Sequence, residues 1–275
     1  MSLRRIPKWT PIAKPMIGML HIPPLPGSPR FNGNMDSVIV SVLRDAATLV
    51  EAGIHGLLLE NYGDAPFYSG QVPAHTVAQM TRLALQVRSR FEVPLGINVL
   101  RNDGQGALAI AQAVNACFVR VNVLCGVSIT DQGIIQGIAH ELLRDRANLD
   151  ATHIDILADI DVKHSAAIVS RSIEDEVHDT ILRGGADGLI VSGNTTGQTV
   201  DVEHLNAVRS AAKEIPVLVG SGLSVEELEQ YWPLADGFIV GTSLKRDGIV
   251  TNSVDVARVA ELMEEHTRLA EQVMR

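Results

Sequence analysis

Two carboxylates, an amine and an imidazole fall close together in the run Asp159-Ile160-Asp161-Val162-Lys163-His164, which ends an apolar segment. A carboxylate or His164 could shuttle a proton next to a carbonyl, the role we rank first. A desolvated Lys163 could instead form a Schiff base. Third, Asp159, Asp161 and Glu60 could hold a hard divalent ion such as Mg²⁺. These roles stay open, whereas a structural zinc site is not expected, because the spacing typical of zinc ligands is absent.

Other apolar segments also end in polar residues. The spacing of these polar residues places their side chains on one face of each predicted strand. Residues two apart on a β-strand share a face, and in a barrel one face looks into the pore. Arg120 and Asn122 share parity on one segment, as do Asp159 and Asp161 on another. Buried charges are costly unless they are paired or functional. We interpret the polar set as functional; the alternative is an ion-pair network that only orders the strand ends.

Chemistry suggests a role for each member of this set. Glu60, Asp159 or His164 would move a proton. Arg120 and Lys163 would stabilise developing negative charge, and Asn98 and Asn122 would orient substrate hydroxyl groups. The sequence predicts as catalytic residues Glu60, Arg120, Asp159, Asp161, Lys163 and His164, and as substrate-binding residues His21, Asn61, Asn98 and Asn122.

Small residues follow the last three apolar segments and predict a phosphate site. Such residues let backbone N–H groups approach an anion closely, and in barrels a phosphate often lies between the loops after strands seven and eight and a short helix N-terminus. The alternative is that glycine only serves tight turns. The predicted phosphate ligands are Ser192 and Gly193, then Gly220, Ser221 and Gly222, and finally Gly241, Thr242 and Ser243.

Eight short apolar segments alternate with segments of helical periodicity, such as 36–52. These elements must position the predicted catalytic and binding residues. Continuous apolar strands indicate burial on both faces, which is typical of parallel sheets covered by helices. We predict a single (β/α)8 barrel of the TIM type over 15–275, preceded by an extension over 1–14. An open doubly wound sheet is the competitor. The predicted strands are 15–21, 54–61, 94–98, 117–122, 154–161, 187–192, 216–220 and 235–240.

Three long loops, 21–34, 61–73 and 125–133, are expected to rise over the catalytic face as lids. By contrast, Asp45 and Glu51 flank the apolar stripe of the first helix and are expected on its solvent side, outside the chemical centre. Apolar residues in the last helical segment predict self-association into a homo-oligomer: Val254, Val256, Val259, Leu262 and Met263.

Composition excludes several classes of protein. The formal net charge of −9 argues against general affinity for nucleic acid, and no apolar run approaches the roughly 20 residues that span a bilayer. Cys117 and Cys125 lie in or beside an apolar run, which favours buried free thiols in a reducing compartment. A cytoplasmic protein without a signal peptide is expected.

Several motifs together resemble the BtpA family from about residue 15 to the C-terminus. The resemblance implies a barrel-type protein, named for a role in photosystem I biogenesis in cyanobacteria, with relatives in organisms that have no photosynthesis. The motifs include Gly18-Met19-Leu20-His21, Glu60-Asn61-Tyr62-Gly63-Asp64-Ala65-Pro66-Phe67, Gly96-Ile97-Asn98-Val99-Leu100-Arg101-Asn102-Asp103, Ala158-Asp159-Ile160-Asp161-Val162-Lys163-His164 and Gly241-Thr242-Ser243-Leu244-Lys245.

The sequence thus predicts an enzyme that acts on a phosphorylated sugar or nucleotide-like molecule, by isomerisation, a lyase reaction or glycosyl cleavage. Asp159→Asn and Lys163→Met should each reduce turnover or binding by roughly a hundredfold. The alternative is a non-catalytic assembly or regulatory factor that uses the barrel as a scaffold.

Overall fold

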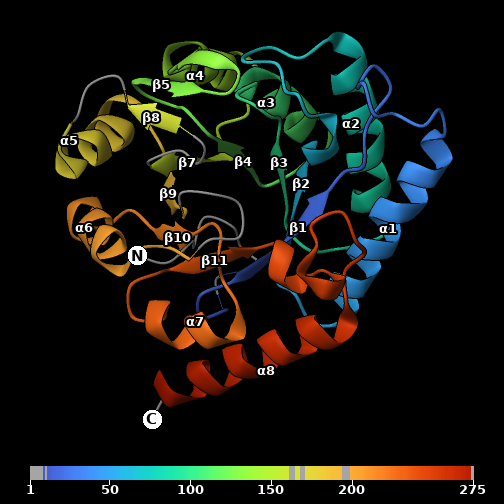
Figure 1. Ribbon diagram of the computed structural model, residues 1–275. Coiled ribbons are helices and arrows are strands. Elements are labelled where there is room, and N and C mark those ends of the chain that lie inside the picture. The colour runs from blue at the N-terminus through green and yellow to red at the C-terminus, as the bar shows by residue number, and fades with distance from the viewer. Residues whose placement is uncertain (1–8, 10, 161–164, 168–170, 194–198, 274–275) are drawn as a thin grey trace.

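Eight parallel strands close into a barrel in the computed structural model, which describes residues 9, 11–160, 165–167, 171–193 and 199–273 (Figure 1). All eight predicted strands are confirmed, and with them the (β/α)8 fold. In order around the barrel they are β1 (Met16–His21), β11 (Gly237–Val240), β10 (Val217–Val219), β9 (Gly188–Val191), β7 (Asp155–Ile160), β4 (Phe118–Val121), β3 (Leu95–Asn98) and β2 (Gly56–Glu60).

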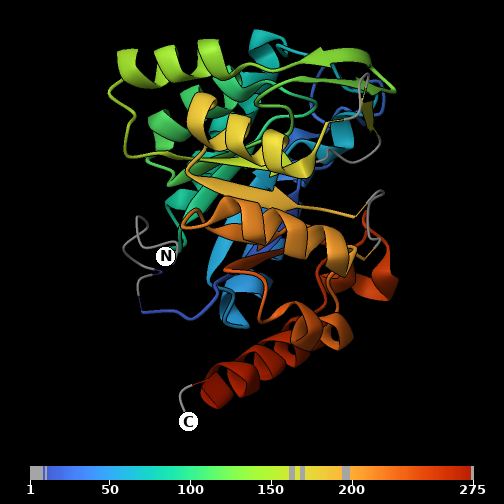
Figure 2. The ribbon, with the colours of Figure 1, turned by 90° about the vertical axis from the view of Figure 1, so that its left-hand side faces the viewer.

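Helices surround the barrel, as two perpendicular views show (Figures 1 and 2). Several begin at polar caps: the Asn34 side chain accepts the Ser37 N–H, and Ser224 and Glu227 form a capping box at the start of α7. No helix in the described part of the chain is long and apolar enough to cross a membrane. The helices are α1 (Met35–Glu51), α2 (Ala74–Arg88), α3 (Gly104–Val114), α4 (Ala139–Asn148), α5 (Ile173–His178), α6 (Val202–Ala212), α7 (Val225–Tyr231) and α8 (Val256–Val273).

The pore is filled by apolar side chains at the N-terminal ends of the strands. Trp9 is 1% exposed, donates its indole N–H to the His55 carbonyl at 2.7 Å and packs against Phe118. Residues assigned above to an extension therefore contribute to the barrel core. With this end occupied, polar side chains gather at the opposite end. The pore cluster comprises Trp9, Ile17, Met19, Leu58, Phe118, Leu157, Ile190, Leu218 and Ile239.

The segment expected as a lid loop over 125–133 instead contains a β-hairpin. Strands β5 (Val127–Thr130) and β6 (Gly133–Gln136) pair antiparallel, and β8 (Ser165–Ala167) adds to β5. Apolar and polar residues alternate along β5, with Val127 and Ile129 exposed and Ser128 and Thr130 partly buried. The expectation of a loop without strands over 125–133 is therefore wrong, because β5 finds its partners in β6 and β8.

Asp45 is buried, contrary to the expectation that it faces solvent. It is 6% exposed, and its Oδ2 lies 2.7 Å from Nζ of Lys245, itself 1% exposed. Its Oδ1 accepts the backbone N–H of Val254 at 3.3 Å. The partners of Asp45 lie after β11, some two hundred positions away, so helical periodicity could not reveal them. Glu51 is exposed as expected.

The apolar residues that predicted self-association mostly pack within this chain. Val254, Val259 and Leu262 are buried in the core, whereas Val256 is 59% exposed. The stripe on α8 therefore covers the barrel, and it does not itself require a second copy. Self-association stays a prediction.

Candidate functional site

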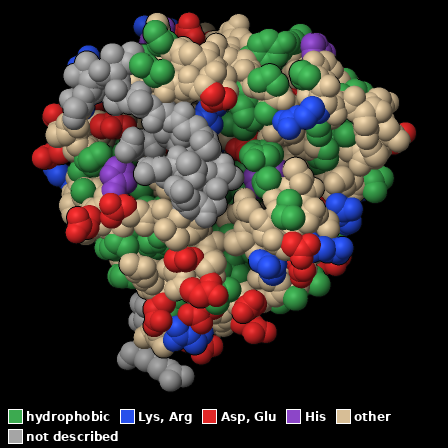
Figure 3. All heavy atoms as spheres, in the orientation of Figure 1, with side chains coloured by type: hydrophobic (Ala, Val, Ile, Leu, Met, Phe, Trp, Pro, Cys, Tyr) green, Lys and Arg blue, Asp and Glu red, His purple; other side chains and the backbone are tan. Residues whose placement is uncertain are grey.

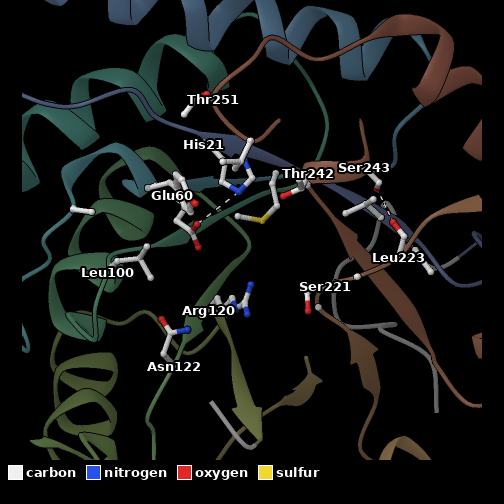
Figure 4. Close-up of a pocket in the computed structure, with 18 of the residues that line it drawn as sticks. His21, Glu60, Leu100, Arg120, Asn122, Ser221, Leu223, Thr242, Ser243 and Thr251 are labelled. Atoms are coloured by element: carbon white, nitrogen blue, oxygen red, sulfur yellow. Dashed lines mark hydrogen bonds and ion pairs between the residues drawn. The ribbon is translucent and has the colours of Figure 1, made fainter. Parts of the chain in front are cut away.

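A cavity of 840 Å³ opens at the carboxyl ends of the barrel strands. Its walls carry carboxylate, guanidinium, amide, imidazole and hydroxyl groups from β1, β2 and β4 and from the segments that follow β3, β10 and β11 (Figure 4). Cavities of this size hold small molecules. Predicted site residues in its lining are His21, Glu60, Arg120, Asn122, Gly220, Ser221, Gly222, Gly241, Thr242 and Ser243.

Arg120 and Asp159 form a buried ion pair at the floor of the site. Arg120 Nη2 lies 2.9 Å from Oδ1 of Asp159, and Nε lies 3.2 Å from both carboxylate oxygens. Asn122 Nδ2 donates to Oδ2 of Asp159 at 2.6 Å. Burial alone would lower the pKa of Arg120, but the Asp159 and Glu60 carboxylates outweigh it and raise that pKa. Arg120 is therefore a fixed cation, and Asp159 orients it.

Glu60 and His21 face each other at the ends of the paired strands β2 and β1. Their register is direct, and His21 Nε2 lies 3.9 Å from Oε1 of Glu60 (Figure 4). The ring of Tyr62 packs against His21, with centroids 4.9 Å apart. Burial and then the nearby Glu60 carboxylate raise the pKa of the Tyr62 phenol. Glu60 and His21 therefore place two titratable side chains next to each other in the cavity wall.

Asn61 and Asn98 lie behind the lining of the cavity. Asn61 Oδ1 accepts the backbone N–H of Leu100 at 2.7 Å, which fixes the segment after β3. Asn98 Nδ2 donates to the Arg120 carbonyl at 3.1 Å and to Oδ1 of Asn122 at 3.2 Å. Both amides thus hold other site residues in position in this structure, and substrate contact by Asn61 and Asn98 stays a prediction.

The predicted phosphate turns surround one side of the cavity. A Cβ on Gly220 would lie 2.3 Å from Cγ2 of Ile190, and one on Gly241 would lie 2.8 Å from Cε1 of His21, so both positions need glycine for space. Gly222 has φ +63°, a conformation that favours glycine. Thr242 and Ser243 open the 3₁₀ turn η4 (Thr242–Leu244).

Ser192 and Gly193 form a second layer behind these turns. The Gly193 N–H donates to Oγ of Ser221 at 2.9 Å, and Ser192 Oγ lies 3.5 Å from Nη2 of Arg120. In this arrangement the Gly193 N–H is used by Ser221. The two residues therefore support the cavity wall, and direct phosphate contact by them stays a prediction.

Sequence reasoning did not single out Arg101 as a site residue. Arg101 follows β3 and lines the cavity, as do Arg30 and Asp131 from the predicted lid segments. Burial lowers the pKa of Arg101, more strongly than the carboxylates of Asp159, Glu60 and Asp131 raise it. Its position, shortly after the polar end of a predicted strand, was the feature of the sequence that could have identified Arg101 as a site residue.

Three predicted catalytic residues, Asp161, Lys163 and His164, lie outside the described residues. Among the residues that are described, no three His, Cys, Asp or Glu side chains group as a metal site. Asp159 is already engaged by Arg120 and Asn122. A Mg²⁺ site that combines Glu60 and Asp159 with Asp161 stays a prediction.

The face of the molecule in Figure 3 carries interspersed charges, with acidic side chains gathered at its lower edge, over α7. Glu226, Glu227 and Glu229 belong to that helix. No broad basic stripe of the kind that binds a nucleic-acid backbone is visible on the part of this face where described residues are drawn.

A family model described as the BtpA family matches residues 12–268. The chain belongs to the BtpA family. It is 51% identical over 253 residues to an uncharacterized protein of Thermococcus kodakarensis, with 91% of this chain and 94% of that protein covered. It is 44% identical over 250 residues to the photosystem I biogenesis protein BtpA of Synechocystis sp., with 91% and 87% covered.

Solved structures similar to this BtpA-family chain are (β/α)8 barrels of low sequence identity. Phosphoribosyl anthranilate isomerase from Thermus thermophilus superposes with a TM-score of 0.55 at 9% identity, covering 93% of this chain and 99% of that one. An archaeal fructose 1,6-bisphosphate aldolase gives a TM-score of 0.56 at 16% identity, covering 94% and 97%. At these identities the likeness concerns the fold.

Proposed function

We propose that this BtpA-family barrel is an enzyme that acts on a phosphorylated sugar or nucleotide-like small molecule. The reaction is an isomerisation, a lyase reaction or a glycosyl cleavage. One observation carries the proposal: the Glu60–His21 pair, the fixed Arg120 cation and the glycine turns after β10 and β11 all open into one cavity. A proton carrier, a charge stabiliser and an anion anchor are thus within reach of one bound molecule.

The phosphate of the substrate binds at the turns Gly220-Ser221-Gly222 and Gly241-Thr242-Ser243. The first residues of a helical turn have backbone N–H groups without partners inside that turn, and these bind anions. Thr242 and Ser243 stand at such a position. This places the remainder of the substrate over the centre of the cavity.

Glu60 moves the proton and Arg120 stabilises the negative charge that develops. Because Asp159 is held by Arg120 and Asn122 on both of its oxygens, its role is to keep Arg120 oriented. His21, beside Glu60, is placed to share the proton or to bind a substrate oxygen. Similar folds in phosphoribosyl anthranilate isomerase and fructose 1,6-bisphosphate aldolase, both named for phosphorylated substrates, support the substrate class.

The experiment is incubation with a panel of sugar phosphates and nucleotides in D₂O, followed by NMR and mass spectrometry. An isomerase or lyase incorporates deuterium at carbon, and a cleaving enzyme releases a new product. Glu60→Gln should lower the rate by about 10²-fold to 10⁴-fold, whereas Glu51→Gln, an exposed carboxylate on α1, should leave it unchanged. Turnover that survives Glu60→Gln would refute this assignment of the proton carrier.

A second candidate function is a non-catalytic role in assembly, which the name of the Synechocystis relative suggests. In a host with a measurable phenotype, an assembly factor tolerates Glu60→Gln and Arg120→Met but not changes on its outer helices. An enzyme shows the opposite pattern. EDTA treatment of the purified protein, with Mg²⁺ added back, tests the predicted metal in the same assay.

A further inference from the structure

A second cavity, of 270 Å³, adjoins the main cavity. Phe67 and Leu100 line both, so the two cavities meet at these side chains. Figure 4 shows Leu100 on the same side of the main cavity as Glu60. Sites for whole small molecules typically have volumes of about 300–1,000 Å³, so a space of this size suits one part of a larger ligand.

The walls of the second cavity are largely apolar and include two aromatic rings. Phe67 is half-buried, whereas Tyr68 is 56% exposed and stands at the outer edge. Walls of this kind suit a flat ring, because heteroaromatic rings stack on aromatic side chains. The apolar and aromatic lining residues are Pro29, Pro66, Phe67, Tyr68, Val72 and Leu100.

Polar groups in this lining have hydrogen-bonding capacity to spare. Thr76 is 6% exposed, and its hydroxyl forms no hydrogen bond within the described part of the chain. The buried Oγ of Ser28 has no partner there either. Asp64 accepts the Leu25 N–H at 2.8 Å and Nδ2 of Asn61 at 3.2 Å, and a carboxylate has about four lone-pair sites. Since buried polar groups almost always have partners, these groups are available to a bound molecule.

The loops that form the second cavity are tied together before any ligand binds. The Gly63 N–H donates to the Ile22 carbonyl at 2.9 Å, and a Cβ on Gly63 would lie 2.3 Å from the Pro24 nitrogen. The loops after β1 and β2 therefore touch at this glycine. The Tyr68 carbonyl accepts the Arg101 N–H at 3.0 Å, which joins the loop after β2 to the segment after β3. The cavity is thus preformed, as most small-molecule sites are.

We propose that the second cavity binds a planar nitrogen heterocycle of the nucleobase type, and that the same ligand extends past Phe67 and Leu100 into the main cavity. The ring stacks on Phe67 and Tyr68, and its polar edge meets the Asp64 carboxylate and the two hydroxyl groups. A sugar ring in this place would turn hydroxyl groups toward largely apolar walls. This inference rests on the proposed function and narrows its substrate class to nucleotide-like molecules.

Calorimetric titration with a matched series of compounds tests this base subsite. The probes are ribose 5-phosphate, the 5′-monophosphates of adenosine, guanosine, cytidine and uridine, the four nucleosides without phosphate, and trehalose 6-phosphate, which carries a second sugar ring in place of a base. The best nucleotide should bind about tenfold to a hundredfold tighter than ribose 5-phosphate, the gain expected when a base stacks on aromatic side chains.

Two variants each remove one contact of the base. Phe67→Leu removes the aromatic face and should abolish most of the gain. Thr76→Val replaces the hydroxyl by a methyl group and should reduce the gain by about twofold to tenfold. Both should leave the affinity for ribose 5-phosphate within about threefold. The matched controls are Phe91→Leu, between α2 and β3, and Thr81→Val, further along α2, which do not line the second cavity and should change nothing.

Each outcome decides the question. Ribose 5-phosphate that binds as tightly as every nucleotide overturns this inference and leaves the proposed function standing. A gain that persists in both variants, or one seen only with trehalose 6-phosphate, also overturns it. If nucleosides bind, lose affinity in Phe67→Leu and gain nothing from a phosphate, the base subsite stands and the phosphate site of the proposed function fails. If no probe binds, both fail.

Discussion

The Arg120 guanidinium donates to the Asp159 carboxylate through both Nε and Nη2, each within 3.2 Å of its oxygens, across the neighbouring strands β4 and β7. Asp159→Asn leaves a buried cation without its counter-charge. We expect the free energy of unfolding to fall by about 3–5 kcal/mol, and ligand affinity to fall because Arg120 is no longer held. Urea denaturation monitored by circular dichroism measures the first effect. A stability within about 0.5 kcal/mol of wild type would show that the pair is not maintained in solution.

Breaking the buried pair between Asp45 and Lys245 should destabilise the barrel by a similar amount. Asp45→Asn and Lys245→Met each leave one charged partner in the core, at a cost of about 3–5 kcal/mol. Removing both, as Asp45→Leu with Lys245→Met, should recover part of the loss, because no buried charge remains. Glu51→Gln on the same helix should stay within about 0.5 kcal/mol. Additive losses in the double variant would contradict the pairing.

Acid should weaken the protein through His55. This ring accepts the Met16 N–H at Nδ1 and packs 4.8 Å from the ring of His266. Burial, and then the neighbouring His266, lower the pKa of His55 from 6.5 to about 4. Because the unfolded state binds the proton more readily, this contribution is fully present above pH 6.5 and is lost as the pH falls toward 4, by about 3 kcal/mol.

Unfolding curves between pH 4 and 7.5 check this pH dependence, with His55→Gln as the comparison. The variant should show a shallower loss of stability over that range, since its other titrating groups are unchanged. Parallel curves for the two proteins would rule out His55 as the source.

Substitution of Gly241 by any residue with a side chain should weaken ligand binding, because Gly241 lies very close to the His21 ring. The added Cβ of Gly241→Ala would lie 2.8 Å from Cε1 of His21 and 3.2 Å from Cγ of Met19, so the imidazole must shift. We expect a tenfold or larger loss of affinity for a phosphorylated ligand, estimated from about 1.4 kcal/mol per tenfold. Gly70→Ala, where nothing lies within 4 Å of the added atom, is the control. Equal affinities would exclude a tight contact at this turn.

The sequence pattern was enough to predict the strands, because continuous apolar segments that end in polar residues are typical of a parallel barrel. It also predicted that the side chains of Arg120, Asn122 and Asp159 face the pore, because residues two apart on a strand share a face. The pairing of Arg120 with Asp159 did not follow, since parity alone does not give register between strands. The burial of Asp45 was missed for a related reason: its counter-charge is supplied by a residue remote in sequence. Arg101 was missed as a site residue because it stands after the strand, where only the loop geometry decides whether a side chain turns inward.

Trp9 and the apolar layer above it fill the barrel at the N-terminal ends of the strands, so among the described residues the cavity is open at the carboxyl ends and closed below. A molecule that enters the cavity from the carboxyl ends must therefore also leave from there. In the proposed enzyme, substrate and product would share that route, and a slowly leaving product should act as a competitive inhibitor.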